Sequence, residues 1–522
     1  MGQIWTLFTT EMWEKFTFYG LRAIFSLFLV HFLGLSESDA ALYYGAFLAF
    51  SYLVPIIGGA LADRVFGYHT SIIIGSILLT LSQLAFFVSA SGIFSLHFAV
   101  LAAVLTSLGN GFFKPSITAL LSIRAPKNAS IDAIFSNYYF FLNLGVLLGS
   151  FIVPFFGDSV SDGVRDLSAF KWGFLATCVA MSFGLLLYIF VAKNSEKTLF
   201  KKQDYFSLNL HSLGICIAIF VLIFTLISLL SSGNWIKSVF YPAIYALGVA
   251  LMCYVFLEKS LEKDEKKAVL RIFISSFFIV FFLATFEQTG TSLTFIANNQ
   301  MDRKIFGYDM PASMISMFNP FFVLLLSIPF SLLWAYLERK NGTLNNLKIQ
   351  SFGLFLLGFG YFFISQNVAN LGSQSLSVWL FVGLYFMQTC AEMMVLPIGF
   401  SLVAKSAPRR FLGLIFGVFY LAIAAGYALS GTLATLLPPT ADKFVKAQNL
   451  GINLSDVLLN GASQDVIEIL VKNALPVKFP EILGFQIINL SDFFMIFCTM
   501  SFIASVLLFG LCSIKNDKIE II

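Results

Sequence analysis

The segment TTEMWEKFTFYGLRAIFSLFLVHFLGL, residues 9–35, has the length and the apolar composition of a membrane-spanning helix. Four charged side chains interrupt it, at Glu11, Glu14, Lys15 and Arg22. In a helix these positions form one stripe, because they follow each other at offsets of 0, 3, 4 and 11 residues. A charge at the bilayer centre costs about 2.5–3.5 kcal/mol on insertion scales. The stripe must therefore face protein or water inside a bundle.

The composition of the whole chain indicates the same environment. Of the 522 residues, 58% are hydrophobic and 11% are charged, and the mean hydropathy is +0.87. About fourteen windows are long enough for a membrane helix of roughly 20 apolar residues, whereas a β-barrel would show alternating strands of roughly ten. The sequence predicts an all-α integral membrane protein.

The predicted spans divide into two sets of six with a pair between them. We expect them at residues 12–34, 41–63, 70–91, 94–121, 133–157, 170–192, 208–231, 237–257, 269–296, 311–337, 349–367, 376–404, 411–437 and 489–513. We predict an amino-terminal six-helix bundle over 1–193, a linker with two additional spans over 194–267, and a carboxyl-terminal six-helix bundle over 268–522. The additional spans carry no buried charge, so we expect them outside the transport path. The long outer loop 438–490 should contain a short surface helix.

The distribution of Lys and Arg predicts the orientation. With the amino terminus inside, inner connections collect about twenty of these residues and outer connections about nine. We therefore expect both termini to be cytoplasmic, in the inner or plasma membrane. The net charge of +4 is what this bias produces and indicates no nucleic-acid partner.

The motif GGALADRVFGYHTSI, residues 58–72, connects the second and third predicted spans. Its glycines allow close helix approach, and Asp63 with Arg64 can bind helix termini or partner charges. The motif resembles the loop motif of the major facilitator superfamily, which implies a role in gating the inner side. The alternative is an ordinary turn at the membrane edge.

Charges inside the spans have opposite signs in the two halves. Arg22 and Lys114 give the amino-terminal half a positive site, and Glu287 and Glu392 give the carboxyl-terminal half a negative one. A zwitterion with separated ends would fit between them. Neutral polar side chains accompany these charges and could contact a substrate or pack between helices: Tyr19, Tyr52, Asn143 and Asn319.

The first span also carries a cluster suited to proton exchange. Glu11 precedes Lys15 by one helical turn, the favourable order for an ion pair, and Glu14 lies beside it. Two acids against one base leave a carboxylate that can bind a proton. A purely structural salt bridge is the alternative.

Two motifs resemble the proton-dependent oligopeptide transporters, a branch of the major facilitator superfamily. EMWEKFTFYGLR, residues 11–22, resembles their ExxERFxYYGxR signature, and YYFFLNLG, residues 138–145, resembles FYxxINxG. The resemblance implies the superfamily fold, with 12 core helices in two six-helix bundles. The 2 extra linker helices, 14 in total, are similar to those of bacterial members.

The resemblance also implies roles for the polar residues. Glu11, Glu14, Lys15 and Glu287 would couple protons, and Glu287 would also take part in gating. Arg22 and Lys114 would hold a peptide carboxylate, and its amino end would be held by Asn143, Asn319 and Glu392. Two residues depart from the signature: Lys15 replaces Arg and loses the guanidinium fork, and Phe18 replaces Tyr and loses a hydroxyl.

We therefore predict a proton-coupled symporter that imports di- and tripeptides by alternating access, as a monomer in the lipid bilayer. The proton gradient would supply the energy, without a cofactor or a metal. One alternative is the same fold carrying nitrate, an amino acid or a peptide-like compound, and another is a non-transporting membrane sensor. The sequence shows no nucleophile with a base, no metal cluster and no phosphate loop, so we expect no enzyme.

Overall fold

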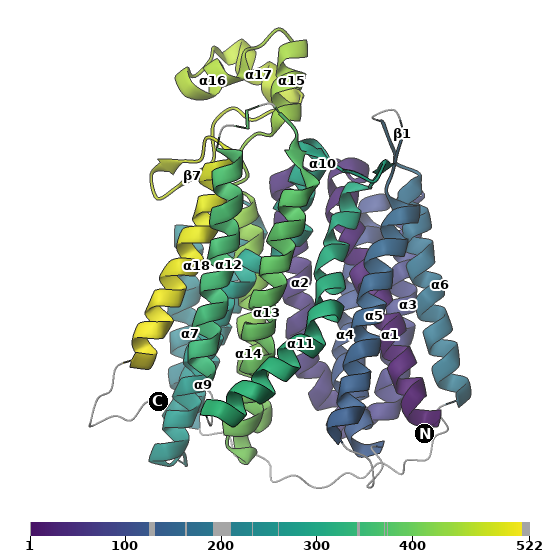
Figure 1. Ribbon diagram of the computed structural model, residues 1–522, viewed down its shortest axis with the longest axis vertical. Helices are drawn as coiled ribbons and strands as arrows, with labels where there is room; N and C mark the ends of the chain where they lie inside the picture. The colour runs from purple at the N-terminus through teal and green to yellow at the C-terminus, as the bar shows by residue number, and fades with distance from the viewer. Residues whose placement is uncertain are drawn as a thin grey trace.

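The computed structural model describes residues 2–124, 131–161, 164–191, 210–231, 233–258, 260–341, 345–369, 371–372 and 374–513. The described chain is almost entirely α-helical (Figure 1). Twelve of its helices are long and apolar enough to cross a membrane. The charged α1 and the shorter apolar stretch of α7, Gly214–Leu230, run beside them. The predicted all-α membrane protein is confirmed.

The long helices form two groups around a seam. The first group is α1 (Gly2–Leu27), α2 (Glu37–Leu61), α3 (Tyr68–Ala90), α4 (Ser95–Arg124), α5 (Ile131–Gly157) and α6 (Ala169–Val191). The second is α9 (Lys263–Phe286), α10 (Ser292–Asn299), α11 (Phe318–Asn341), α12 (Asn346–Val368), α13 (Val378–Ser406), α14 (Leu412–Ala434) and α18 (Leu490–Ser513). Across the seam α2 packs along α14, and α5 contacts α11.

Short π and 3-10 turns begin or end several of these helices. They are η1 (Phe28–Phe32), η2 (Ala62–Phe66), η3 (Ile236–Phe240), η4 (Glu287–Gly290), η5 (Ala312–Met317) and η6 (Arg409–Phe411). The accessory pair α7 (Leu210–Leu230) and α8 (Tyr241–Leu257) pack together, and α8 also contacts α14. The predicted domain boundary at 193 falls on residues outside the described part of the chain.

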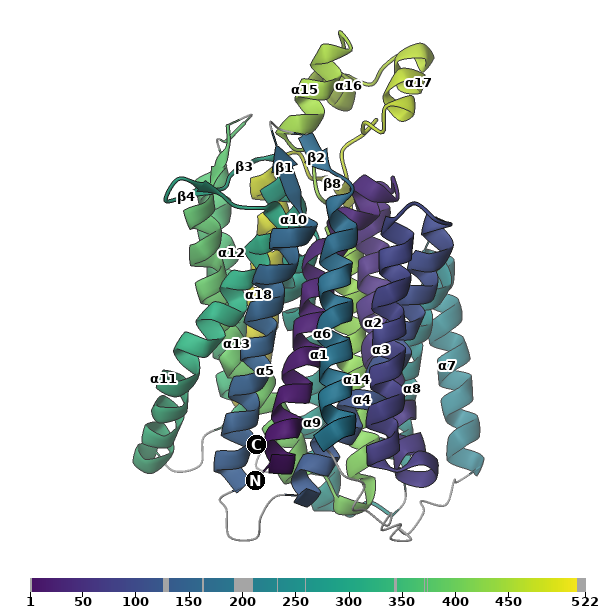
Figure 2. The same ribbon diagram turned by 90° about the vertical axis from the view of Figure 1, so that its right-hand side faces the viewer.

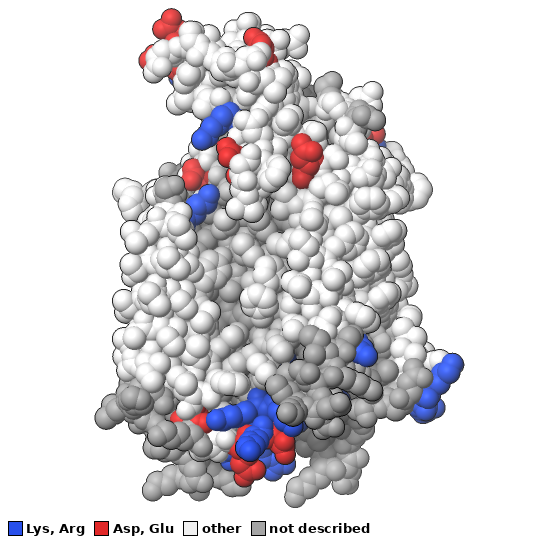
Figure 3. Space-filling view, turned by 90° about the vertical axis from the view of Figure 1, so that its left-hand side faces the viewer, with Lys and Arg blue, Asp and Glu red and all other residues white. Residues whose placement is uncertain are grey.

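We call the end of the bundle where α1 begins and α18 ends the inner end, and the opposite end the outer end (Figures 1 and 2). In the view of Figure 3, charged side chains gather at the two ends, and an uncharged band separates them. An uncharged band around helices of this length is what a bilayer requires. The chain is a multi-pass membrane protein.

The predicted span 269–296 is not one continuous helix. It consists of α9 and α10, with the single turn η4 between them. At Gly290, in this turn, an added methyl group would overlap the Tyr44 side chain from α2. Because Gly290 has no side chain, η4 and α2 can approach closely. The apolar run in the sequence conceals this break.

The outer loop contains more structure than predicted. Instead of one short helix it has three, α15 (Ala441–Asn449), α16 (Leu454–Asn460) and α17 (Gln464–Lys472), with a small apolar core of their own. The helices are separated because Gly451 and Gly461 have φ angles of 74° and 82°, which interrupt a helix.

Among the residues that the structure describes, four pairs of strands lie in the outer connections. Three are antiparallel: β1 (Ser159–Ser161) with β2 (Val164–Asp166), β4 (Lys304–Ile305) with β5 (Tyr308–Asp309), and β7 (Glu481–Ile482) with β8 (Phe485–Gln486). The pair β3 (Met301–Asp302) and β6 (Leu376–Ser377) is parallel.

Candidate functional site

A cavity of about 110 Å³ lies between the two groups of helices. Six of the side chains predicted to bind substrate line it. Tyr19, Arg22 and Tyr52 come from the first group, and Glu287, Asn319 and Glu392 come from the second. The structure thus brings together residues from α1, α2, η4, α11 and α13 at one place.

Arg22 and Glu287 form a buried ion pair across the seam. Arg22 also donates from Nε to the Tyr44 hydroxyl at 3.3 Å, and its guanidinium lies 4.9 Å from the centre of the Tyr19 ring. Removing one partner of such a pair leaves an uncompensated buried charge, which costs about 3–5 kcal/mol. The pair therefore joins the two groups firmly while both side chains are charged.

Asn319 orients the carboxylate on the opposite wall. Its amide nitrogen donates to Oε2 of Glu392 at 2.9 Å and to Oγ1 of Thr389 at 3.1 Å. All three residues belong to the second group, on α11 and α13. The cavity consequently has a cation on its first-group wall and an oriented carboxylate on its second-group wall.

The predicted proton cluster forms beside the cavity and has a fourth member. Lys15 Nζ lies 2.9 Å from Glu11 Oε1 and 2.7 Å from Glu14 Oε2. The other oxygen of Glu14 lies 3.8 Å from Lys114 Nζ. Lys114, which the sequence predicts as a partner of the peptide carboxylate, does not itself line the cavity. The carboxylate of Glu14, which is fully buried, is shared by two lysines.

Phe18, one of the two departures from the family signature, lies under Lys114. The Lys114 ammonium is 4.0 Å from the centre of the Phe18 ring and 5.2 Å from that of Tyr52. An ammonium over the face of an aromatic ring is stabilised by the ring quadrupole. Phe18 therefore supports this cation through its ring, without the hydroxyl.

Three other predicted residues lie elsewhere. Asn143 donates to the carbonyl of Tyr139 in its own helix, at 2.8 Å, and does not line the cavity. Asp63 is exposed in η2, near the inner end. The side chain of Arg64 lies outside the described residues. The gating role predicted for these two stays a prediction.

The cavity also contains polar residues that the sequence did not single out. They are Tyr44, Thr289, Thr294, Tyr427, Ser150 and Ser316. Tyr44 lies two turns before Tyr52 on α2, so helical spacing could have suggested it, and both threonines follow Glu287 in FEQTGTSLT. Tyr427 lies in an apolar stretch of α14, and nothing in that stretch distinguishes it from a packing residue.

A set of polar contacts joins the two groups at the outer end. Glu37, at the start of α2, accepts from Asn299 at 2.8 Å and pairs with Lys443 of α15 at 3.2 Å. Burial of Lys443 favours its neutral form, but Glu37 and Asp442 raise its pKa above the usual value. Asp158 accepts from the Ser313 hydroxyl at 2.6 Å. The structure is therefore closed on its outer side.

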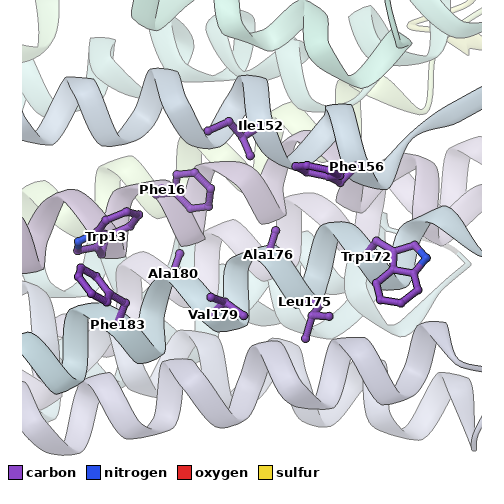
Figure 4. A pocket seen from close by; sticks show the side chains of 10 residues that line it. All are labelled: Trp13, Phe16, Ile152, Phe156, Trp172, Leu175, Ala176, Val179, Ala180 and Phe183. Atoms are coloured by element: carbon purple, nitrogen blue, oxygen red, sulfur yellow. The ribbon is translucent and has the colours of Figure 1, made fainter.

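A second, larger hollow lies on the membrane-facing surface. It measures about 650 Å³, lies between α1, α5 and α6, and is lined by apolar side chains (Figure 4). Trp172, Val179 and Phe183 line it and are exposed. The charges that characterise the central cavity are missing from its lining, so we do not assign it to the site.

Comparison with known proteins identifies the family. The model of the POT family matches residues 66–450, well over half of the chain. The chain belongs to the POT family. POT relatives include dipeptide and tripeptide permease B of Aliivibrio fischeri (strain MJ11), 27% identical over 436 residues, which are 82% of this chain and 84% of the relative. The permease B of Salmonella typhimurium (strain LT2) is 27% identical over 435 residues, 82% and 85% of the two chains.

Solved structures of POT proteins confirm the fold. A POT family transporter in complex with 5-aminolevulinic acid has a TM-score of 0.73 at 21% identity, over 97% of this chain and 95% of that one. Another, in complex with a thioalcohol conjugated peptide, has a TM-score of 0.73 at 22% identity, over 98% and 96%. The predicted membership of this transporter family and the predicted fold, with twelve core helices and an accessory pair, are thus confirmed.

Proposed function

We propose that the protein is a proton-coupled symporter that imports di- and tripeptides by alternating access. The observation that carries this proposal is the cavity between the two groups, with Arg22 on one wall and Glu392 on the other. A zwitterionic peptide needs a partner for each charged end in such a partly dehydrated place. Relatives with the same family membership are dipeptide and tripeptide permeases.

The two ends of a peptide would be held by the two different groups of helices. Arg22, with Lys114 behind the Tyr52 ring, would attract the carboxylate. Glu392, oriented by Asn319, would accept from the ammonium group. A bound peptide therefore links the two groups and favours the states in which they are close together.

Proton coupling would depend on the Glu14 carboxylate, which two lysines share. While Glu14 is ionised, it holds both Lys15 and Lys114. Protonation of Glu14 would release the Lys114 ammonium, which could then pair with a peptide carboxylate. Protonation of Glu287 would likewise break its ion pair with Arg22 and loosen the seam. Protons and peptides would thus promote each other's binding, as linkage requires.

The size of the cavity fits a closed intermediate of this cycle. Its volume of about 110 Å³ is below the roughly 300–1,000 Å³ typical of small-molecule sites. A peptide would enter only after the two groups separate, as in the rocking motion of transporters built from two such halves.

We also propose that both termini lie in the cytoplasm and that the chain lies in the cell membrane. It would act as a monomer on peptides and protons, without a cofactor.

The direct test is uptake into proteoliposomes with an imposed proton gradient. We expect labelled dipeptides to accumulate when the outside is acidic and to stop accumulating when the gradient is collapsed. Unlabelled dipeptides and tripeptides should compete, whereas nitrate and single amino acids should not. Accumulation driven by sodium, or competition by nitrate alone, would contradict the proposal.

Phe18→Leu should raise the KM for a dipeptide about 30-fold. The ring supports the Lys114 ammonium at 4.0 Å, and a desolvated cation–π contact is worth about 2 kcal/mol. Phe18→Tyr, which keeps the ring, should leave the KM within about threefold, because the contact depends on the ring face.

Phe47→Leu is the matched control for this variant. Phe47 is buried against Phe18, with ring centres 6.1 Å apart. Its replacement by leucine removes the same side-chain volume as Phe18→Leu. If both leucine variants raise the KM equally, packing and not the cation–π contact explains the effect.

A further inference from the structure

The accessory helix α8 reaches the seam between the two groups. Its first residue, Tyr241, is 2% exposed, and its hydroxyl donates to the carbonyl oxygen of Leu42 in α2 at 2.8 Å. The same helix packs along α14 of the second group. Neither α7 nor α8 contributes to the lining of the central cavity, as the sequence predicts. The accessory pair nevertheless contacts the helices that must separate.

The Tyr241 hydroxyl lies at a point where α2 and α14 approach closely. A methyl group added at Gly45 of α2 would lie 2.7 Å from this oxygen and 2.9 Å from Cα of Gly431 in α14. One added at Gly431 would lie 2.5 Å from the same oxygen and 2.9 Å from the carbonyl oxygen of Ala41. Three helices therefore meet at one point that has no room for another side chain, and small residues are what permit such an approach.

The turn before α8 contacts both groups as well. Lys237 of η3 donates to Oγ1 of Thr435, at the end of α14, at 3.3 Å. The ring of Phe240 lies edge-on to that of Phe50 in α2, with centres 6.4 Å apart. The accessory pair thus touches the first and the second group on the same outer part of the seam.

We propose that the accessory pair holds the outer side closed, with Tyr241 as the positioning residue that fastens α2 to α14. The proposal rests on the alternating-access function, because opening toward the outside requires these two helices to separate at this point. On separation the hydroxyl would lose the Leu42 carbonyl. An unpaired hydroxyl is unfavourable away from water, so the hydrogen bond favours the closed state.

Tyr241→Phe tests this role because it removes the hydroxyl and keeps the ring. Interhelical hydrogen bonds in membranes contribute modestly, so we expect the ratio of outward-open to outward-closed molecules to rise about threefold, and at most about 18-fold. The ratio is measured from distances between spin labels at Ser91→Cys and Gln366→Cys, exposed outer positions on the two groups. The six native cysteines are replaced by serine, and the protein is in lipid nanodiscs without substrate.

Tyr245→Phe is the matched control. Tyr245 lies one turn further along α8, and its hydroxyl interacts with the Thr432 side chain of α14, in the second group. It should leave the distance distribution unchanged. Gly45→Ala displaces the Tyr241 hydroxyl from the other side and should shift the distribution in the same direction as Tyr241→Phe.

An unchanged distribution in Tyr241→Phe, or an equal shift in Tyr245→Phe, would overturn the proposal. The distances are measured without peptide or a proton gradient, so they do not depend on what the protein transports. Failure of dipeptide uptake in the wild type would instead contradict the proposed function and leave this result standing.

Discussion

Glu14→Gln is expected to abolish concentrative dipeptide uptake while exchange of dipeptide across the membrane continues. The buried carboxylate of Glu14 is shared by Lys15 and Lys114, and its neutral replacement can neither bind nor release a proton. Loss of a buried charge partner costs about 3–5 kcal/mol, so gradient-driven uptake should fall at least about 100-fold. Exchange needs the peptide site but no net proton movement, and should keep a measurable rate.

Both rates are measured in the same proteoliposomes, with and without a proton gradient. Glu468→Gln makes the same chemical change on the exposed surface of α17 and should leave both rates unchanged. Uptake by Glu14→Gln that still responds to the gradient would remove Glu14 from the coupling mechanism.

The second large effect concerns the ends of the substrate. A carboxyl-amidated dipeptide should compete for uptake at least about 100-fold more weakly than the free acid, because it offers no carboxylate to Arg22 on the first-group wall or to Lys114 beside it. In Lys114→Ala the amidated peptide should lose little further affinity, since that contact is already absent. The inhibition constants of both peptides on both proteins form a double-mutant comparison.

The opposite end provides the matched experiment. Glu392→Gln removes the carboxylate that Asn319 orients. This substitution should therefore change the inhibition constant of an amino-acetylated dipeptide very little. The proposed orientation is wrong if the amidated peptide competes as well as the free acid, or if its penalty is unchanged in both Lys114→Ala and Arg22→Ala.

Contacts between residues that are close in the sequence could be predicted. Glu11, Glu14 and Lys15 lie within one helical turn or so, and charges are rare enough in apolar spans to demand a role. The structure places them in contact as expected. Opposite charges on the two halves likewise located Arg22 and Glu392 on facing walls of one cavity.

Residues that act through contacts distant in the sequence could not be predicted. The pairing of Lys114 with Glu14 joins positions 100 residues apart and depends on where α1 and α4 approach. Tyr241 begins a helix, α8, that carries no charged residue, and only the close approach of Gly45 and Gly431 reveals its position. The break at η4 interrupts a continuous apolar run, so hydropathy alone conceals it.

The outer end of the bundle carries ion pairs that differ in their access to water. The side chains of Lys443 and Glu37 are 24% and 22% exposed, whereas those of Arg165 and Asp158 are 8% and 0% exposed. Dissolved ions screen charges over about 8 Å at physiological ionic strength and about 3 Å at 1 M, but act much less on buried pairs. The salinity of the surrounding medium therefore weakens the contact of the outer helices with α2 and spares the pair that Arg165 of β2 forms with Asp158.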